Sequence, residues 1–396
     1  MNYIIYLVYP IMIALFLWGA KKSPKGEFND EVMSLKQTKA FQGYIALCIM
    51  LHHLGQKTCA SWLKPKYIVP GLEFFVPIGY FFVGVFLFCS GYGLYKSHVT
   101  KPDYPGKGFV RHRIVPIIVI YYITIFIYLL VRLFVVHEKM TDKLQILWYA
   151  TGLQLANPYG WYVCVVPFFY LCFYFAYRYC KKDSTALIIV AVFTFLYTLL
   201  GTFIDHNDWW MRGEWWYNCI HLFLIGLIFG TYEEKITAHL KRHYKLYLIL
   251  SFVLIFVFYI LSEITQGIFT YYGETFGAPD TVLRRWKCLI PQILASTSFV
   301  VFMFMLQMKL KIGNRFLHFM GTMTLEFYLI HGIFIELFCY TFDDGDAKPL
   351  YYIRSNVLLT LIVFALAIPS ALALKQISKK LLKKNVPVVA EEGSAL

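Results

Sequence analysis

The chain has 396 residues, of which 59% are hydrophobic and only 15% are charged, whereas soluble domains carry about 25% charged residues. This composition excludes an ordinary soluble protein. The net charge of +14 does not indicate nucleic-acid binding, because the basic residues lie in short connections between apolar segments, as membrane topology requires. The nine cysteines include no CxxC spacing, so we expect neither a metal site nor a disulfide framework.

Apolar segments recur along the whole chain and predict an all-α fold, a polytopic transmembrane helical bundle of about 11 spans. The second and seventh segments are short, so we expect them to extend into their flanks. In chain order the predicted spans are Asn2–Gly19, Phe41–Gly55, Phe74–Tyr95, Ile114–Val136, Trp161–Cys180, Thr185–Ile204, Tyr217–Tyr232, Leu246–Leu261, Leu289–Gln307, Phe316–Tyr340 and Asn356–Leu374.

The distribution of basic residues predicts the orientation of these spans. The odd-numbered connections and the C-terminal tail together carry more than twice as many Lys and Arg residues as the even-numbered connections. By the positive-inside rule, the N-terminus of this multi-pass cell-membrane protein lies outside and the C-terminus is cytoplasmic. We therefore divide the chain into an additional N-terminal helix with its cytoplasmic loop (1–35), a membrane domain (36–374) and a basic cytoplasmic tail (375–396).

The second predicted span, Phe41–Gly55, carries two adjacent histidines, His52 and His53, at the end of an otherwise apolar run. Ionisable side chains inside spans are costly and are therefore candidates for function. Positions eleven apart on a helix differ by about 20°, which places Gln42 and His53 on one face, about 16 Å apart along the axis. Lys39 lies on the same side. This stripe predicts a lining for a long polar substrate, and the alternative is a helix end whose histidines meet interfacial water.

Four later segments combine polar or aromatic residues with the hydropathy of spans. They read FFVGVFLFCSGYGLYKS, FVRHRIVPIIVIYY, WYVCVVPFFYLCFYF and MGTMTLEFYLIHGIFI. Together with LKQTKAFQGYIALCIMLHHL, and in this order between Lys36 and Leu374, they resemble the signatures of the membrane acyltransferase-3 family. That family has a ten-span core, so the resemblance implies that the first span, Asn2–Gly19, is an addition.

In this family an arginine, followed by ten residues and a histidine, marks the catalytic helix. The chain departs from that pattern, because Gln42 stands at the arginine position, while His53 stands at the histidine position. The sequence leaves open whether Lys39 supplies the cation instead. The resemblance implies that His53 is catalytic, and a neutral histidine suits the deprotonation of a hydroxyl. Whether His53 acts as a base or carries the acyl group stays open.

The resemblance implies a membrane O-acyltransferase. We expect an O-acetyltransferase that moves acetyl from acetyl-CoA, or an acyl group from another acyl-CoA, to a hydroxyl of a cell-surface glycan or its lipid-linked precursor. The donor is polyanionic, and Arg111 and Arg113 lie at the predicted cytoplasmic mouth of a span, where guanidinium groups grip phosphates. The alternative role of both arginines is topology anchoring. Acyl-CoA is a substrate here, and no tightly bound cofactor is expected.

Glu326 and His331 are a second pair of ionisable residues inside one predicted span, and we expect both to be catalytic. Five residues apart, they differ by about 140° around a helix and do not face each other. We therefore expect each to have a partner on a neighbouring helix. That partner either holds the imidazole in one tautomer for catalysis or forms a structural hydrogen bond.

A transporter or flippase for a glycolipid or a small polar solute is the alternative function. It would use the polar stripe of the second span for passage rather than for chemistry. Both functions place the protein in the lipid bilayer, and the sequence does not predict the oligomeric state.

Overall fold

The structure, a computed structural model, describes residues 3–135, 137, 142–207, 209–269, 277–339 and 351–384. Within these ranges the regular structure is almost entirely helical, which confirms the all-α prediction. Some predicted features lie outside the described residues, namely the span ends at Asn2, Val136 and Tyr340 and the tail beyond Lys384.

The helices follow the apolar segments of the sequence closely. The α-helices are α1 (Val8–Leu17), α2 (Leu35–Thr58), α3 (Gly79–Thr100), α4 (Val115–Leu130), α5 (Gln145–Thr151), α6 (Trp161–Tyr179), α7 (Asp183–Phe203), α8 (His221–Arg242), α9 (Tyr244–Ile268), α10 (Thr281–Gln307), α11 (Arg315–Gly321), α12 (Thr324–Phe338) and α13 (Asn356–Lys384). The short 3-10 helices are η1 (Tyr3–Leu7), η2 (Pro65–Tyr67), η3 (Glu73–Phe75) and η6 (Glu214–Trp216), and the π-helical turns are η4 (Val110–Ile114) and η5 (Val131–Val135). Two-residue strands β1 (Lys21–Lys22) and β2 (Leu310–Lys311) pair antiparallel.

Each predicted span falls on helix in the structure, with two differences. The helix α5 was not predicted, and the predicted single helix Phe316–Tyr340 is wrong at Thr322 and Met323, where the chain breaks between α11 and α12. The break turns α11 against α2, where a Cβ on Gly43 or on Gly321 would overlap the backbone of the other helix. Close approach of backbones at small residues is the usual way in which membrane helices pack.

Among the residues that the structure describes, six helical segments are long and apolar enough to cross a membrane. They support a multi-pass membrane protein, while the predicted total of eleven spans stays a prediction. The six segments are Val110–Val135, Trp161–Tyr179, Asp183–Phe203, Tyr244–Ile268, Thr281–Gln307 and Asn356–Leu382.

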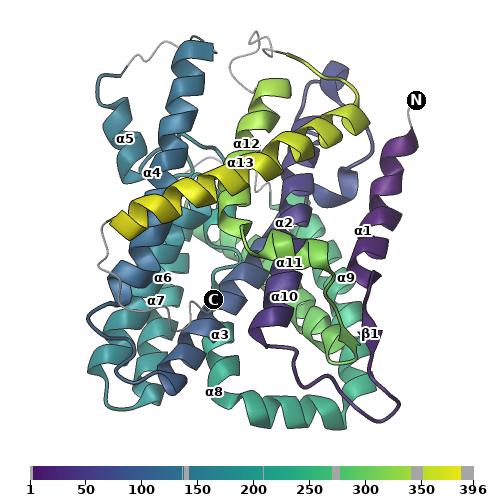
Figure 1. Cartoon of the computed structure of the whole chain (residues 1–396), viewed down its shortest axis with the longest axis vertical. Coiled ribbons are helices and arrows are strands. Elements are labelled where there is room, and N and C mark those ends of the chain that lie inside the picture. Colours follow the sequence, from purple (N-terminus) through teal and green to yellow (C-terminus); the bar gives the residue numbers. More distant parts are fainter. Residues whose placement is uncertain are drawn as a thin grey trace.

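Figure 1 shows how the helices surround α2, with α13 crossing the front of the bundle obliquely. In this position α13 packs against α12, α4 and α2. The helix α8 bends at Tyr232, whose φ of −116° and ψ of 23° are not helical, and it then runs across the base of the bundle in Figure 1. The bundle therefore combines upright helices with segments that lie across them.

The crossing of α3 and α8 depends on two glycines that face each other. A Cβ on Gly91 would overlap the Phe223 carbonyl, and a Cβ on Gly226 would overlap the Phe88 carbonyl. Gly91 belongs to the Ser-Gly pair that ends the aromatic run FFVGVFLFCSG. In this structure that motif serves helix packing.

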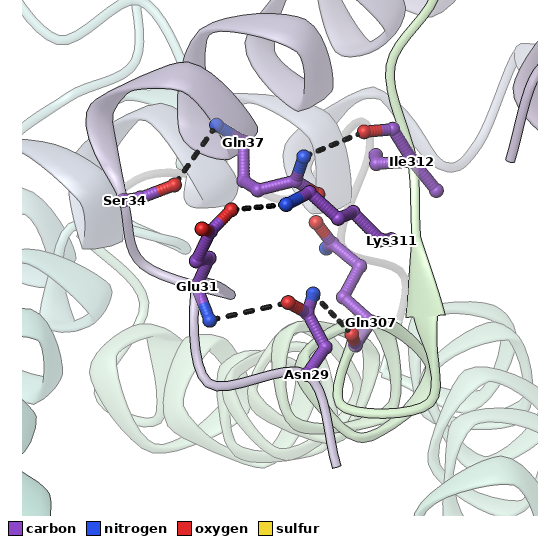
Figure 2. Close-up of polar contacts among 7 residues, drawn as sticks. All are labelled: Asn29, Glu31, Ser34, Gln37, Gln307, Lys311 and Ile312. Carbon is purple, nitrogen blue, oxygen red and sulfur yellow. Dashed lines mark hydrogen bonds and ion pairs between the residues drawn. The ribbon is translucent and has the colours of Figure 1, made fainter. Parts of the chain in front are cut away.

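A group of polar contacts, called the latch below, joins the start of α2 to the end of α10 and to β2 (Figure 2). The Asn29 amide donates to the Gln307 carbonyl at 3.0 Å, and the buried Gln37 amide donates to the Ile312 carbonyl at 2.8 Å. The Ser34 hydroxyl accepts the Gln37 N–H at 3.3 Å and so caps α2. These contacts fix the direction in which α2 enters the bundle.

The latch also contains an ion pair between Glu31 and Lys311 (Figure 2). Both side chains are exposed, and the hydrogen bond from Lys311 lowers the pKa of the Glu31 carboxyl. With the β1–β2 pairing, this contact ties the segment that precedes α2 to the connection that follows α10.

Candidate functional site

Two histidines that the sequence places on separate spans meet inside the bundle. The Nδ1 atom of His53, on α2, lies 2.7 Å from the Nε2 atom of His331, on α12. His53 is 6% exposed and His331 is fully buried. The expectation that His331 has its partner on a neighbouring helix is therefore met, and the partner is His53.

A backbone carbonyl fixes the protonation of this pair. His331 Nδ1 lies 2.7 Å from the Phe327 carbonyl oxygen, which can only accept a hydrogen bond, so Nδ1 carries the proton. In the neutral ring Nε2 is then unprotonated and accepts from His53 Nδ1–H. A neutral His53 with its proton on Nδ1 has a free lone pair on Nε2. The geometry thus makes His53 Nε2 available as a base.

Tyr159 covers one face of His53, with ring centroids 4.2 Å apart and the planes inclined by 30°. Three contacts hold this tyrosine in place. Its hydroxyl donates to Glu336 at 3.0 Å, and its N–H donates to Asn157 at 3.0 Å. Its carbonyl accepts from the Tyr328 hydroxyl. The stacked position of the ring is therefore built into the fold.

Lys57 forms an ion pair with the same Glu336 oxygen at 2.9 Å, and its side chain is only 10% exposed. The sequence analysis missed Lys57, Glu336 and Tyr159 as site residues. Lys57 follows His53 by four residues, so both lie on one helix face, and this spacing was a usable signal. Tyr159 lies in a connection, where no periodic pattern could identify it.

His52 has a different environment from its neighbour. Its Nδ1 lies 2.8 Å from the Phe75 carbonyl, and its ring occupies the space that a Cβ on Gly79 would fill. Since a carbonyl only accepts, Nδ1 of His52 donates. These contacts give His52 a packing role between α2 and α3.

Glu326 lies apart from the histidine pair. No hydrogen bond or ion pair among the described residues joins it to His331, and its electrostatic partners are Lys375 and Lys379 on α13. Lys375 also interacts with Lys39 of α2. The structure thus brings the predicted site residues Glu326 and Lys39 into one charged cluster, while the catalytic assignment of Glu326 stays a prediction.

Gln42 is half-buried and interacts with the Cys89 thiol of α3. It lies on α2 between Lys39 and His53, as the sequence spacing requires. The role of Gln42 and Lys39 in substrate binding stays a prediction, and the structure adds that Gln42 faces α3.

The two predicted phosphate-binding arginines differ in exposure. Arg113 is half-buried, and its guanidinium donates to the Tyr104 hydroxyl at 3.2 Å and to the Ser97 hydroxyl at 3.3 Å. Arg111 is exposed. Two hydroxyl groups therefore hold Arg113, whereas Arg111 lies at the surface, and the phosphate-binding role of both arginines stays a prediction.

Aromatic side chains, called the tyrosine row below, lie between Arg113 and His53; they are Tyr170, Tyr162 and Tyr328. Arg113 interacts electrostatically with Tyr170, and Ser90 interacts with both Tyr170 and Tyr162. The ring centroids of Tyr162 and Tyr328 lie 6.0 Å apart, and the Tyr328 centroid lies 6.2 Å from that of His53. Hydroxyl-bearing side chains thus follow one another from the arginine to the histidine pair.

The chemistry available at this site is proton transfer by imidazole. Among the residues that the structure describes, no three His, Cys, Asp or Glu side chains gather in an arrangement that could hold a metal ion. The same described ranges contain no hydrogen bond between a carboxylate and either histidine of the pair. His331, rather than a carboxylate, is therefore the residue that orients His53.

A family model described as an acyltransferase domain, of the acyltransferase-3 family, matches residues 40–375. The matched range runs from α2 into α13 and includes both histidines of the pair. The elements η1, α1 and β1 precede it. No curated protein and no solved structure matches the chain.

Proposed function

The chain belongs to the acyltransferase-3 family and is a membrane acyltransferase, and we propose that it is an O-acetyltransferase with His53 as its general base. The proposed donor is acetyl-CoA, and the proposed acceptor is a hydroxyl of a cell-surface glycan or of its lipid-linked precursor. The observation that carries the role of His53 is its 2.7 Å contact with His331, which leaves Nε2 unprotonated.

In the proposed reaction, the acceptor hydroxyl gives its proton to His53 Nε2 while its oxygen forms a bond to the thioester carbonyl carbon. The bond between that carbon and sulfur then breaks, and the coenzyme A thiolate leaves with the electron pair. The thiolate takes the proton from Nε2, so His53 returns to its neutral state. Each turnover therefore needs no other proton donor.

Two contacts of His53 stabilise the cationic ring that forms during this transfer. When Nε2 is protonated, the hydrogen bond from Nδ1–H to His331 becomes charge-assisted and stronger. The Tyr159 ring, 4.2 Å away, presents its face to the cation. Both contacts gain strength only after proton transfer, which is the requirement for lowering a barrier.

The donor is proposed to enter from the side of Arg113. A half-buried guanidinium held by Ser97 and Tyr104 is suited to one phosphate of coenzyme A. The tyrosine row leads from this arginine toward His53 and would accompany the pantetheine arm to the reacting carbon.

No observation favours the alternative of a transporter or flippase. The two histidines form a closed hydrogen-bonded pair deep in the bundle, and family membership supports chemistry at this site.

Labelled acetyl-CoA and purified protein in detergent test the proposal directly. We expect slow thioester hydrolysis without acceptor, and transfer of label to a glycan fraction when one is added. His53→Ala should lose both activities, while His52→Ala serves as the matched control. Wild-type protein that neither hydrolyses nor transfers the acetyl group, yet moves a glycolipid across vesicles, would refute the enzyme.

Cysteine accessibility in intact cells tests the proposed orientation, with the N-terminus outside. Ser61 and Lys107 are exposed and lie in successive connections, after α2 and after α3. In a background in which the half-buried Cys180 is replaced, Ser61→Cys should react with a membrane-impermeant reagent. Lys107→Cys should react only after the membrane is opened, and the reverse pattern would overturn the orientation.

A further inference from the structure

A cavity of about 280 Å³ lies away from the histidine pair, between η1, the chain before η3 and the start of α13. Its walls include Tyr3 and Tyr6 on one side and residues 354–357 on the other. The elements η1 and α1 precede residue 40, where the family match begins. The cavity is thus formed where the N-terminal addition meets the family core.

Asn356 lines this cavity, and its side chain has a buried oxygen without a partner among the described residues. Asn356 is 4% exposed, and its amide nitrogen donates to the carbonyls of Val69 at 2.7 Å and Pro70 at 3.2 Å. Its Oδ1 atom has no hydrogen-bond partner within the described ranges. Because a buried polar atom without a partner is costly, this oxygen points to a ligand group that donates a hydrogen bond.

Positive charge lines the same cavity. Arg354 lines the cavity, and within the part of the chain that the structure describes no carboxylate pairs with it. Ser355 accepts the Leu358 N–H at 3.4 Å and so caps α13, a helix of 29 residues. The first N–H groups of a long helix, with the partial positive charge of its dipole, favour a bound anion.

The outer side of the cavity is apolar and aromatic. Tyr3 and Tyr6 are 66% and 40% exposed, and α1 continues this exposed surface with Ile11 and Ile13. Exposed apolar side chains on a helix of a membrane protein suit contact with acyl chains, and tyrosine suits the interface with headgroups. A ligand with a polar head and apolar chains therefore matches both parts of the surface.

We infer that this cavity binds a phosphate ester that carries a hydrogen-bond donor, an amine or a hydroxyl, close to its phosphate. The phosphate would lie against Arg354 and the N-terminus of α13. The amine or hydroxyl would donate to Asn356 Oδ1. A phospholipid headgroup and a soluble phosphate ester share this chemistry, and the apolar surface of α1 favours the lipid.

Binding to the purified full-length protein in detergent tests the inference, without acyl donor, so the result does not depend on the proposed activity. The probes are phosphatidylethanolamine and phosphatidylglycerol, which carry the donor, phosphatidylcholine, which lacks it, and glycerol 3-phosphate, which lacks the chains. We expect the first two lipids to bind at least about tenfold more tightly than phosphatidylcholine. Glycerol 3-phosphate binding as tightly as the lipids would identify a soluble ester as the ligand.

Two variants locate the binding site. Arg354→Gln should weaken binding by about tenfold or more, whereas Arg284→Gln, which removes an arginine paired with Asp280 on α10, should leave it unchanged. Val357→Trp should fill the cavity and abolish binding with Arg354 still present. Equal binding of all three lipids, or unchanged binding by Arg354→Gln, would overturn the inference. If Val357→Trp fails to fold, the Arg354→Gln variant decides the outcome.

Discussion

The two ends of α2 make their polar contacts in opposite surroundings. At its beginning the latch places Glu31 and Lys311 in water, with side chains 58% and 40% exposed. Near its end His53 meets His331 where neither ring exceeds 6% exposure. The helix is about 36 Å long, so its polar contacts change from solvent-exposed to buried over that distance.

The difference shows which contacts the fold can lose. An exposed ion pair is screened by water and salt, and its partners are rehydrated when one is removed. A buried imidazole that loses its partner keeps an unsatisfied N–H, which costs about 1–3 kcal/mol. We therefore expect substitutions at the far end of α2 to affect chemistry strongly and those at the latch to affect only stability.

The largest effect is expected from His53→Ala. Removing the base should lower acyl transfer by about 10²–10⁴-fold, because the Phe75 and Phe327 carbonyls hold the neighbouring His52 and His331 in other positions. His52→Ala should retain most of the activity, since His52 is bound to the Phe75 carbonyl. Turnover is measured with labelled acetyl-CoA on protein that elutes as a single species. An inactive His52→Ala protein together with an active His53→Ala protein would mean that His52, not His53, is the base.

Substitution of His331 is expected to have the next largest effect. His331 positions His53 through one hydrogen bond, so His331→Ala should lower kcat by about 10–100-fold with little change in the KM for donor. His331→Gln should recover part of this loss, because its carbonyl oxygen can accept from His53 Nδ1–H. Equal kcat values for the Ala and Gln variants would show that His331 only fills space.

The sequence predicted the helical segments well, because long apolar runs identify them directly. It also indicated that His331 has its partner on another helix, from the angle between His331 and Glu326. It could not identify that partner, since His53 lies 278 residues away in the chain. Contacts of this kind depend on how the helices pack, which hydropathy does not encode.

The break between α11 and α12 shows the same limit. Apolar residues continue on both sides of Gly321 and Thr322, so the sequence predicted one helix. With the chain broken here, α11 lies against α2 at Gly43 and Gly321, where a Cβ would overlap the other helix. Tyr159 was missed for another reason, since it acts from a connection and is held there by contacts with distant residues.

Arg113 is half-buried, so its exposure lies between that of the latch and that of the histidine pair. Arg113→Ala should raise the donor KM by about tenfold or more, the scale of a charge-assisted hydrogen bond worth about 1.5–3 kcal/mol. The exposed Arg111→Ala should change it less. A donor without the 3′-phosphate should reduce the difference between Arg113→Ala and wild type if the contact is to that phosphate. An unchanged donor KM would leave Arg113 as a topology anchor.

The smallest effect is expected at the latch, where Glu31→Gln removes the exposed ion pair (Figure 2). Lys311 lowers the pKa of Glu31, so the pair contributes above the ordinary carboxyl pKa and loses its contribution as pH falls through the lower folded pKa. Any difference in Tm at neutral pH should therefore vanish in acid and in high salt. Gln37→Met, which removes a buried hydrogen bond, should lower Tm by about 1–3 °C at every salt concentration. A larger loss from Glu31→Gln than from Gln37→Met would mean that burial does not set the strength of contacts along α2.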